Sequence, residues 1–173
     1  LIAGNVSGKM WLIGGFLYRT LAAELYGSKC PITDIDFLVE KYVECDDHFP
    51  WRKVRSKFGN PKYVFGNKSI DVVPLDMVAS IRRNSREANL ENFLCGTPLT
   101  VQSIAYEIGT GSVTGDVGMR ALYDKTVRVH DVQEARRAAK MKKMKVPEMI
   151  RSKAESLGFT PGWHVQGRAE IHF

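Results

Sequence analysis

Two glycines and two aspartates within one short segment constrain the fold of this chain more than any other feature. The segment is WLIGGFLYRTLAAELYGSKCPITDIDFLVE, residues 11–40. The apolar run at 9–13 predicts a short buried strand that ends at Gly14 and Gly15. Leucines at four-residue spacing then predict a helix over 16–26. The sequence therefore predicts a strand, a glycine turn and a helix in direct succession.

A second strand is predicted over 34–40, where Asp34 and Asp36 stand inside an otherwise apolar run. Because residues i and i+2 of a strand project to the same face, the two carboxylates point together, while Ile35 and Phe37 face the core. Carboxylates held this close repel each other, so one takes up a proton or a cation lies between them. Exposure at a sheet edge, or a role in capping loops, is the alternative.

A third acid, Asp71, lies in the run SIDVV, where apolar β-branched residues flank it. If that strand lies beside 34–40, the three carboxylates converge. Such a cluster suits Mg²⁺, with Mn²⁺ as the alternative ion, because Mg²⁺ binds one or two carboxylates together with substrate phosphates. It can hold two ions about 3.5–4 Å apart, which clamp the attacking and leaving oxygens of a phosphoryl displacement.

The glycine turn adds a place for the phosphates. Backbone N–H groups at the start of a helix point outward, and the helix dipole favours an anion there. Gly14 and Gly15 have no Cβ that would block a phosphate. A phosphate cradle beside a carboxylate cluster is what a nucleoside triphosphate requires.

The order strand, Gly-Gly, helix, D-x-D strand and later D strand resembles the DNA polymerase β superfamily of nucleotidyltransferases. The likeness is strongest to the head domain of tRNA CCA-adding enzymes and bacterial poly(A) polymerases, through LIGGFLYR, TDIDFLVE and NKSIDVVPL. Looser matches at 97–107 and 119–131 extend it over residues 9 to about 131. The resemblance implies an α+β fold with a mixed, mostly antiparallel sheet flanked by helices.

The resemblance also implies an activity: transfer of a nucleotidyl group from NTP to an acceptor hydroxyl, with release of pyrophosphate. It implies that Asp71 helps to deprotonate the acceptor. Arg19 lies one helical position from the arginine of the family's G-G-x-V-R-D motif. The implied site consists of three metal-binding carboxylates and four nucleotide-binding residues: Asp34, Asp36, Asp71, Gly14, Gly15, Arg19 and Gln102.

The expected organisation is a nucleotidyltransferase-like catalytic domain over 1–131, followed by a basic helical extension over 132–173 that packs on the same domain. The tail after Trp163 alternates apolar and polar residues and predicts a final strand. A short helix is expected within 44–58, and two strands joined by a turn at Gly66 and Asn67 are expected over 62–75.

The net charge of +6 suits a polyanionic partner. Residues 136–153 hold eight Lys or Arg against one Glu. This segment is either a solvated helix face or a face that contacts nucleic acid phosphates.

Other features narrow the class of protein. No apolar run approaches the ~20 residues that span a bilayer, so no membrane association is expected. Cys30, Cys45 and Cys95 are odd in number and widely spaced, which predicts reduced thiols in a cytoplasmic protein. The four histidines lack the spacing of a zinc site.

Three functions fit these observations. The first is a Mg²⁺-dependent nucleotidyltransferase that uses NTP, with RNA or tRNA favoured as acceptor over a protein or a small alcohol. The second is a nucleotide- or RNA-binding module that has the same fold and no turnover. The third is a toxin-type nucleotidyltransferase that modifies tRNA.

Overall fold

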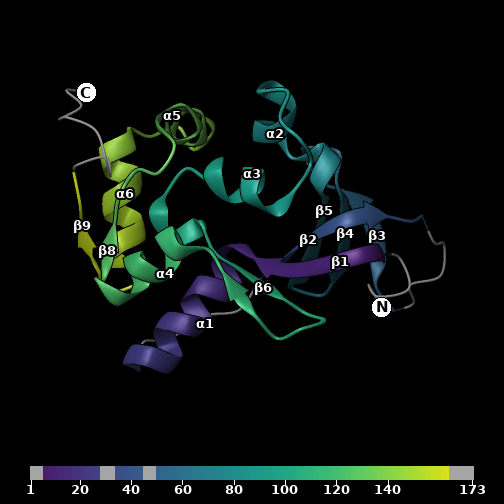
Figure 1. Cartoon of the computed structure of the whole chain (residues 1–173), viewed down its shortest axis with the longest axis horizontal. Helices are drawn as coiled ribbons and strands as arrows, with labels where there is room; N and C mark the ends of the chain where they lie inside the picture. The colour runs from purple at the N-terminus through teal and green to yellow at the C-terminus, as the bar shows by residue number, and fades with distance from the viewer. Residues whose placement is uncertain (1–5, 28–33, 45–49, 164–173) are drawn as a thin grey trace.

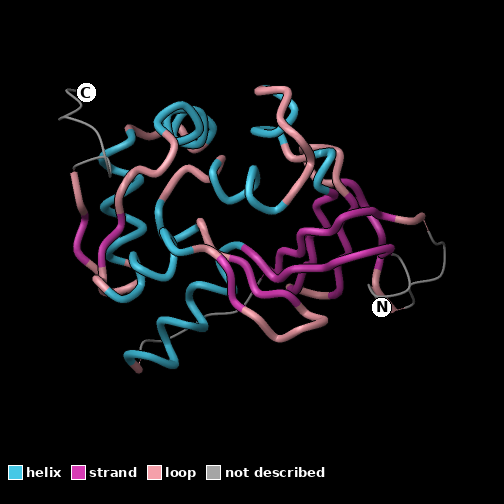
Figure 2. The backbone as a smooth tube through the Cα atoms, in the orientation of Figure 1, coloured by secondary structure: helices cyan, strands magenta, loops and turns pink. Residues whose placement is uncertain are grey.

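The computed structural model describes residues 6–27, 34–44 and 50–163. Within these residues, seven strands form a mixed sheet in the order β3-β4-β5-β2-β1-β6-β7. A mainly helical part lies against one end of this sheet (Figures 1 and 2). The strands are β1 (Val6–Ile13), β2 (Asp34–Tyr42), β3 (Arg52–Arg55), β4 (Pro61–Phe65), β5 (Lys68–Pro74), β6 (Ala105–Glu107) and β7 (Val113–Thr114).

The remaining elements are short helices and a two-stranded parallel sheet. The helices are α1 (Gly14–Tyr26), η2 (Leu75–Met77), α2 (Ala79–Arg83), α3 (Leu90–Cys95), η3 (Thr100–Gln102), α4 (Asp116–Tyr123), α5 (Val132–Met141) and α6 (Val146–Glu155). The small sheet pairs β8 (Thr126–Val127) with β9 (Thr160–Pro161). The predicted α+β fold with a mostly antiparallel sheet is confirmed.

Strand β2 lies in the middle of the large sheet, antiparallel to β1 and parallel to β5. The consecutive residues Leu38 and Val39 of β2 point to opposite faces of the sheet, and both are fully buried. Helical segments thus cover the face of Leu38, which is also the face of the aspartates, and the apolar residues of the sheet cover the face of Val39. The alternative that Asp34 and Asp36 sit at a sheet edge is therefore wrong.

Helix α1 begins directly at the glycine turn and ends at Gly27. Gly27 has φ +68°, and its backbone N–H donates to the carbonyl of Ala23 at 2.7 Å. Glycine adopts this left-handed conformation without steric cost, and the helix ends there. Of the predicted leucine stripe, Leu17 is buried, whereas Leu25 is 60% exposed, so the helix leaves the core in its last turn.

The prediction of a short helix within 44–58 is wrong. Residues Arg52–Arg55 form β3, an edge strand that pairs antiparallel with β4. Lys53 on this strand forms an ion pair with Glu44. The run RKVR carries one apolar residue, so it has no clear strand pattern of its own, and pairing with the neighbouring hairpin decides its conformation. The predicted final strand lies in 164–173, outside the described residues, as do Cys30 and Cys45.

The largest core cluster joins α1 to the helical part of the chain. Leu17, Tyr18 and Ala22 of α1 pack with buried residues of η3, α4, α5 and α6. Asp131 caps the N-terminus of α5, since its carboxylate accepts a hydrogen bond from the backbone N–H of Glu134 at 2.9 Å. The division into domains at residue 131 stays a prediction, and residues from both sides of it share this core. Among the described residues, no helix is both long and apolar enough to cross a membrane.

Candidate active site

The carboxylates form a row across the middle of the large sheet. Asp36 and Asp71 are register partners in the parallel pair of β2 and β5, so their side chains leave the sheet on the same face. Asp34 precedes Asp36 by two residues on that face, and its carboxylate accepts a hydrogen bond from the hydroxyl of Ser69. The structure thus places on one sheet face the three acids that the sequence predicted to converge.

Asp36 is the electrostatic centre of this row. Burial, followed by the charges of Asp71 and Asp34, raises its pKa to about 6. The ammonium of Lys62 and a hydrogen bond from the backbone N–H of Gly15 act in the opposite direction. Lys62 binds Asp71 directly, with 2.8 Å between Nζ and Oδ2. The three carboxylates of the row therefore carry more negative charge than the single ammonium of Lys62 neutralises.

The glycine turn lies against Asp36. Gly14 has φ +72°, and a Cβ built there would lie 2.3 Å from Oδ2 of Asp36. Glycine is required at this position both by the backbone conformation and by the contact with the carboxylate. The glycine turn is therefore in direct contact with the central carboxylate of the row.

Arg19 and Gln102 occupy different surroundings. The charge of Arg19 acts on Tyr18 and on the lysines Lys142 and Lys153, so it lies at the side of α1 that faces the helical part. The side-chain oxygen of Gln102 accepts a hydrogen bond from the backbone N–H of Leu99 at 3.2 Å and closes its own 3₁₀ turn. No described contact joins Gln102 to the carboxylate row. Its role in nucleotide binding therefore stays a prediction.

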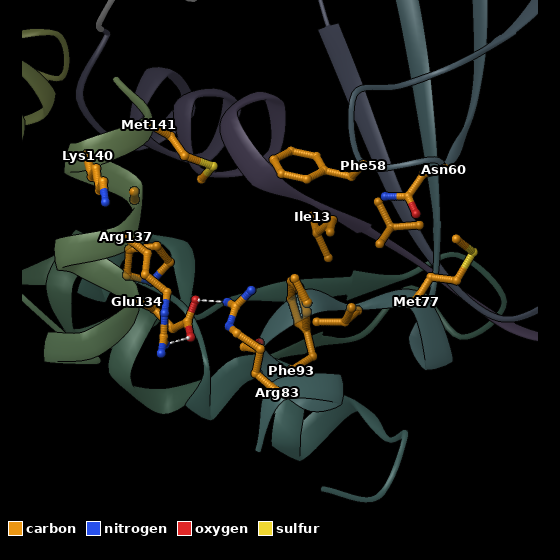
Figure 3. Close-up of a pocket in the computed structure, with 16 residues that line it drawn as sticks. Ile13, Phe58, Asn60, Met77, Arg83, Phe93, Glu134, Arg137, Lys140 and Met141 are labelled. Atoms are coloured by element: carbon orange, nitrogen blue, oxygen red, sulfur yellow. Dashed lines mark hydrogen bonds and ion pairs between the residues drawn. The ribbon is translucent and has the colours of Figure 1, made fainter. Parts of the chain in front are cut away.

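A cavity of about 790 Å³ opens between the sheet and α5 (Figure 3). Ile13, which lines it, directly precedes Gly14 and is the register partner of Asp36. The carboxylates do not line this cavity themselves, although Val73, two residues after Asp71 on the same face, does. The cavity and the carboxylate row are thus adjacent regions of one sheet face.

The cavity wall is mostly apolar, with polar groups at two places. On the sheet side, Asn60 is 7% exposed, and its side-chain oxygen has no hydrogen-bond partner among the described residues. On the α5 side, the carboxylate of Glu134 lies between Arg83 and Arg137 (Figure 3). Sequence patterns gave no indication of this wall, because its residues come from separate segments and Phe58 falls in the stretch where a helix was expected.

We expect Glu134→Gln to destabilise the fold. Glu134 is 7% exposed and pairs with two arginines, one of them Arg137 at 2.7 Å, so the neutral side chain leaves both cations without a carboxylate. The free energy of unfolding should fall by about 1–3 kcal/mol. Each kcal/mol lowers the melting temperature of a chain of this size by roughly 2–4 °C. Thermal unfolding measures this. Glu155→Gln, on the exposed side of α6, is the control, and equal melting temperatures of the two variants would contradict the expectation.

Among the described residues, no three His, Cys, Asp or Glu side chains form a group that could hold a metal ion as they stand. The donor set nevertheless suits a hard divalent cation, because three carboxylates share one face, and the charges of Asp71 and Asp34 add to the effect of burial in raising the pKa of Asp36. The ammonium of Lys62 already binds one of them.

A scan against models of protein families finds no match for the chain, and a search of curated proteins finds no relative. Solved structures do match its fold. Two apo forms of a tRNA-processing enzyme match with TM-scores of 0.57 and 0.56, both at 18% identity and over 89% of this chain. A CCA-adding enzyme in complex with ATP matches with a TM-score of 0.55 at 17% identity, also over 89% of this chain.

These likenesses confirm the resemblance to CCA-adding enzymes at the level of the fold. The chain spans 39% and 41% of the two tRNA-processing enzyme chains and 35% of the CCA-adding enzyme chain. The match therefore concerns the fold of one part of these much longer proteins.

Proposed function

We propose that this chain is a divalent-metal-dependent nucleotidyltransferase that moves a nucleotidyl group from NTP to a hydroxyl group of RNA, with tRNA favoured. One observation carries the proposal. Asp36 and Asp71 are paired in register on the same sheet face, and Asp36 contacts the Gly14–Gly15 turn that opens a helix. The likeness of the fold to a tRNA-processing enzyme and to a CCA-adding enzyme complexed with ATP supports it.

Each part of the substrate has a place on this face. The triphosphate lies at the glycine turn, where backbone N–H groups and the helix dipole favour an anion. The nucleoside extends into the adjacent apolar cavity, whose volume of about 790 Å³ falls in the ordinary range of small-molecule sites.

The divalent cation would be held by Asp36 and Asp71 together with Asp34. When bound, it would neutralise the negative charge that develops on the phosphate oxygens. The acceptor oxygen attacks the α-phosphorus, the bond from this phosphorus to the bridging oxygen of the β-phosphate breaks, and pyrophosphate leaves. Asp71 accepts the proton of the acceptor hydroxyl. The ammonium of Lys62, 2.8 Å from the carboxylate of Asp71, holds that carboxylate in position.

The direct test is incubation with each NTP labelled at the α-phosphate, in the presence of Mg²⁺ or Mn²⁺ and of tRNA or total RNA. We expect label to enter the RNA and EDTA to prevent this. In a parallel incubation with γ-labelled NTP, release or transfer of that label without incorporation of the α-label would indicate hydrolysis or a kinase-like reaction and would overturn the proposal. Binding of nucleotide that ignores EDTA and yields no product would support the non-catalytic module. Label confined to intact tRNA that thereby loses its function in translation would support the toxin-type enzyme.

A further inference from the structure

We infer that the ammonium of Lys62 takes the place of a second divalent cation at Asp71, so that the carboxylate row binds one metal ion rather than two; this inference rests on the proposed function. A cluster of three carboxylates can hold two divalent ions about 3.5–4 Å apart, and the sequence predicted such a cluster. The structure instead places a positive charge of the chain itself on one of the three carboxylates.

The strand pairing determines where Lys62 lies. Lys62 on β4 is the register partner of Asp71 on β5, and Asp71 is in turn the register partner of Asp36 on β2. Directly opposite residues of neighbouring strands project to the same face, so these three side chains share the carboxylate face. Across the sheet, Asp71 thus lies between Asp36 on one side and Lys62 on the other.

The ammonium of Lys62 is held closely and is partly shielded from water. Its Nζ donates a hydrogen bond to Oδ2 of Asp71 at 2.8 Å, a length typical of a charge-assisted hydrogen bond. The side chains of Lys62 and Asp71 are 28% and 19% exposed, whereas Lys9 is 57% exposed in its 3.4 Å pair with Glu107. Salt screens the shielded pair less. A divalent ion that approached Asp71 from the side of β4 would therefore have to displace the ammonium.

The charges of the row balance with one metal ion. The hydrogen bond of Lys62 goes to Oδ2 of Asp71, which leaves Oδ1 for the ion that Asp34 and Asp36 would also bind. Three ionised carboxylates carry three negative charges, and one divalent ion together with one ammonium balances them. A second divalent ion beside Lys62 would leave the row with two positive charges in excess before the substrate binds.

Lysine and a divalent ion are not equivalent at this position. An ammonium donates up to three hydrogen bonds, but it has no coordination site for a hydroxyl oxygen. Lys62 gives one N–H group to Asp71, and a further N–H group can contact the oxygen of the acceptor. Asp71 still accepts the proton of the acceptor hydroxyl, as in the proposed function. Lys62 is thus a positioning residue on the acceptor side of the site.

The number of Mn²⁺ ions bound per chain tests the inference without any turnover. The whole chain is dialysed to equilibrium with saturating Mn²⁺ and a triphosphate whose α–β bridge is a methylene group, and the excess of Mn²⁺ on the protein side gives the number. We expect one ion for the wild type and two for Lys62→Gln, because the amide leaves the carboxylate of Asp71 free to bind a cation. EPR spectra check the count, since two Mn²⁺ ions about 3.5–4 Å apart couple magnetically and one isolated ion does not.

Three variants control for charge and position. Lys62→Arg retains the cation and should bind one ion. Lys62→Gln combined with Asp71→Asn should also bind one, because the second ion then lacks its carboxylate. Lys68→Gln removes an exposed lysine of β5 on the opposite face of the sheet and should bind one ion, as the wild type does.

Two ions bound to the wild type, or only one bound to Lys62→Gln, would overturn the inference. A second ion in Lys62→Gln that persists when Asp71→Asn is added would do the same. The wild-type count requires no substitution, so it can refute the inference even if Lys62→Gln fails to fold. Failure of the proposed function has a different signature, because the counts would follow the expectation while no α-label entered RNA. Conversely, transfer by a wild type that binds two ions would refute the inference alone.

Discussion

Asp36→Asn is expected to remove nucleotidyl transfer while the fold becomes no less stable. Transfer should fall by roughly 10²–10³-fold or more, because the variant lacks the central carboxylate for the cation that stabilises charge in the transition state. Incorporation of α-labelled NTP into RNA measures this. Asn retains an oxygen that accepts the hydrogen bond from the Gly15 backbone N–H, so the glycine turn has no reason to move.

The stability of this variant follows from the pKa of Asp36. It is about 6 in the folded chain against an ordinary value of 3.8, so the folded chain binds more protons between these pH values. The contribution of this group to the free energy of unfolding therefore increases as the pH falls from about 6 towards 4, and above pH 6 the ionised carboxylate destabilises the fold. Each pKa unit corresponds to about 1.4 kcal/mol, so the variant should gain up to about 3 kcal/mol at pH 7.

Thermal unfolding at pH 5 and pH 7 tests this expectation. The wild type should lose stability between pH 5 and 7 relative to Asp36→Asn, because the variant lacks the titrating group. Asp124→Asn, an exposed aspartate after α4, is the matched control and should leave both transfer and unfolding unchanged. A large drop in the melting temperature of Asp36→Asn would instead indicate that Asp36 has a structural role and would remove the basis of the proposed function.

The two glycines should respond very differently to alanine. In Gly14→Ala, the new Cβ would lie 2.3 Å from Oδ2 of Asp36, and φ +72° is unfavourable for alanine. The left-handed backbone alone costs about 1–2 kcal/mol. Asp36 must also move away from the new methyl group, and displacement of a catalytic group by about 1 Å can reduce the rate roughly 10²-fold. We therefore expect losses of both stability and transfer.

Gly15→Ala is the control for this substitution. Its Cβ would meet the hydroxyl of Tyr18 at 3.5 Å, an ordinary contact, and its φ lies outside the left-handed region. Its melting temperature should equal that of the wild type or rise slightly, since alanine favours the helix. Any loss should appear in the KM for NTP, because a methyl group now stands where the phosphate approaches. Equal melting temperatures for both variants would contradict the geometry described for the turn.

The sequence was sufficient for the part of the site that is built locally. The strand before Gly14, the helix after it and the strand of Asp36 each have an apolar pattern of the correct period, and the structure contains all three. The pairing of Asp36 with Asp71 was expected only on condition that their strands are neighbours, and the register confirms that they are.

The rest of the site depends on contacts between distant segments, which no local pattern contains. Lys153 belongs to a basic segment, and nothing in its neighbours indicates that it alone reaches Tyr18. The cavity wall combines Phe58, Arg83 and Glu134 from three separate elements. The strand β3 was expected to be a helix because its charged residues obscure its alternation, and only the adjacent hairpin makes it a strand.

The packing of α1 has a consequence for how the chain is made. Leu17, Tyr18 and Ala22 leave the ribosome before their buried partners in the same core, which begin only at Leu99 and continue to Phe159. At about 5–20 residues per second, synthesis of the intervening chain takes on the order of ten seconds or more. Throughout that interval the apolar side of this first helix lacks its native cover. It is therefore the surface of the nascent chain on which a chaperone would be expected to act.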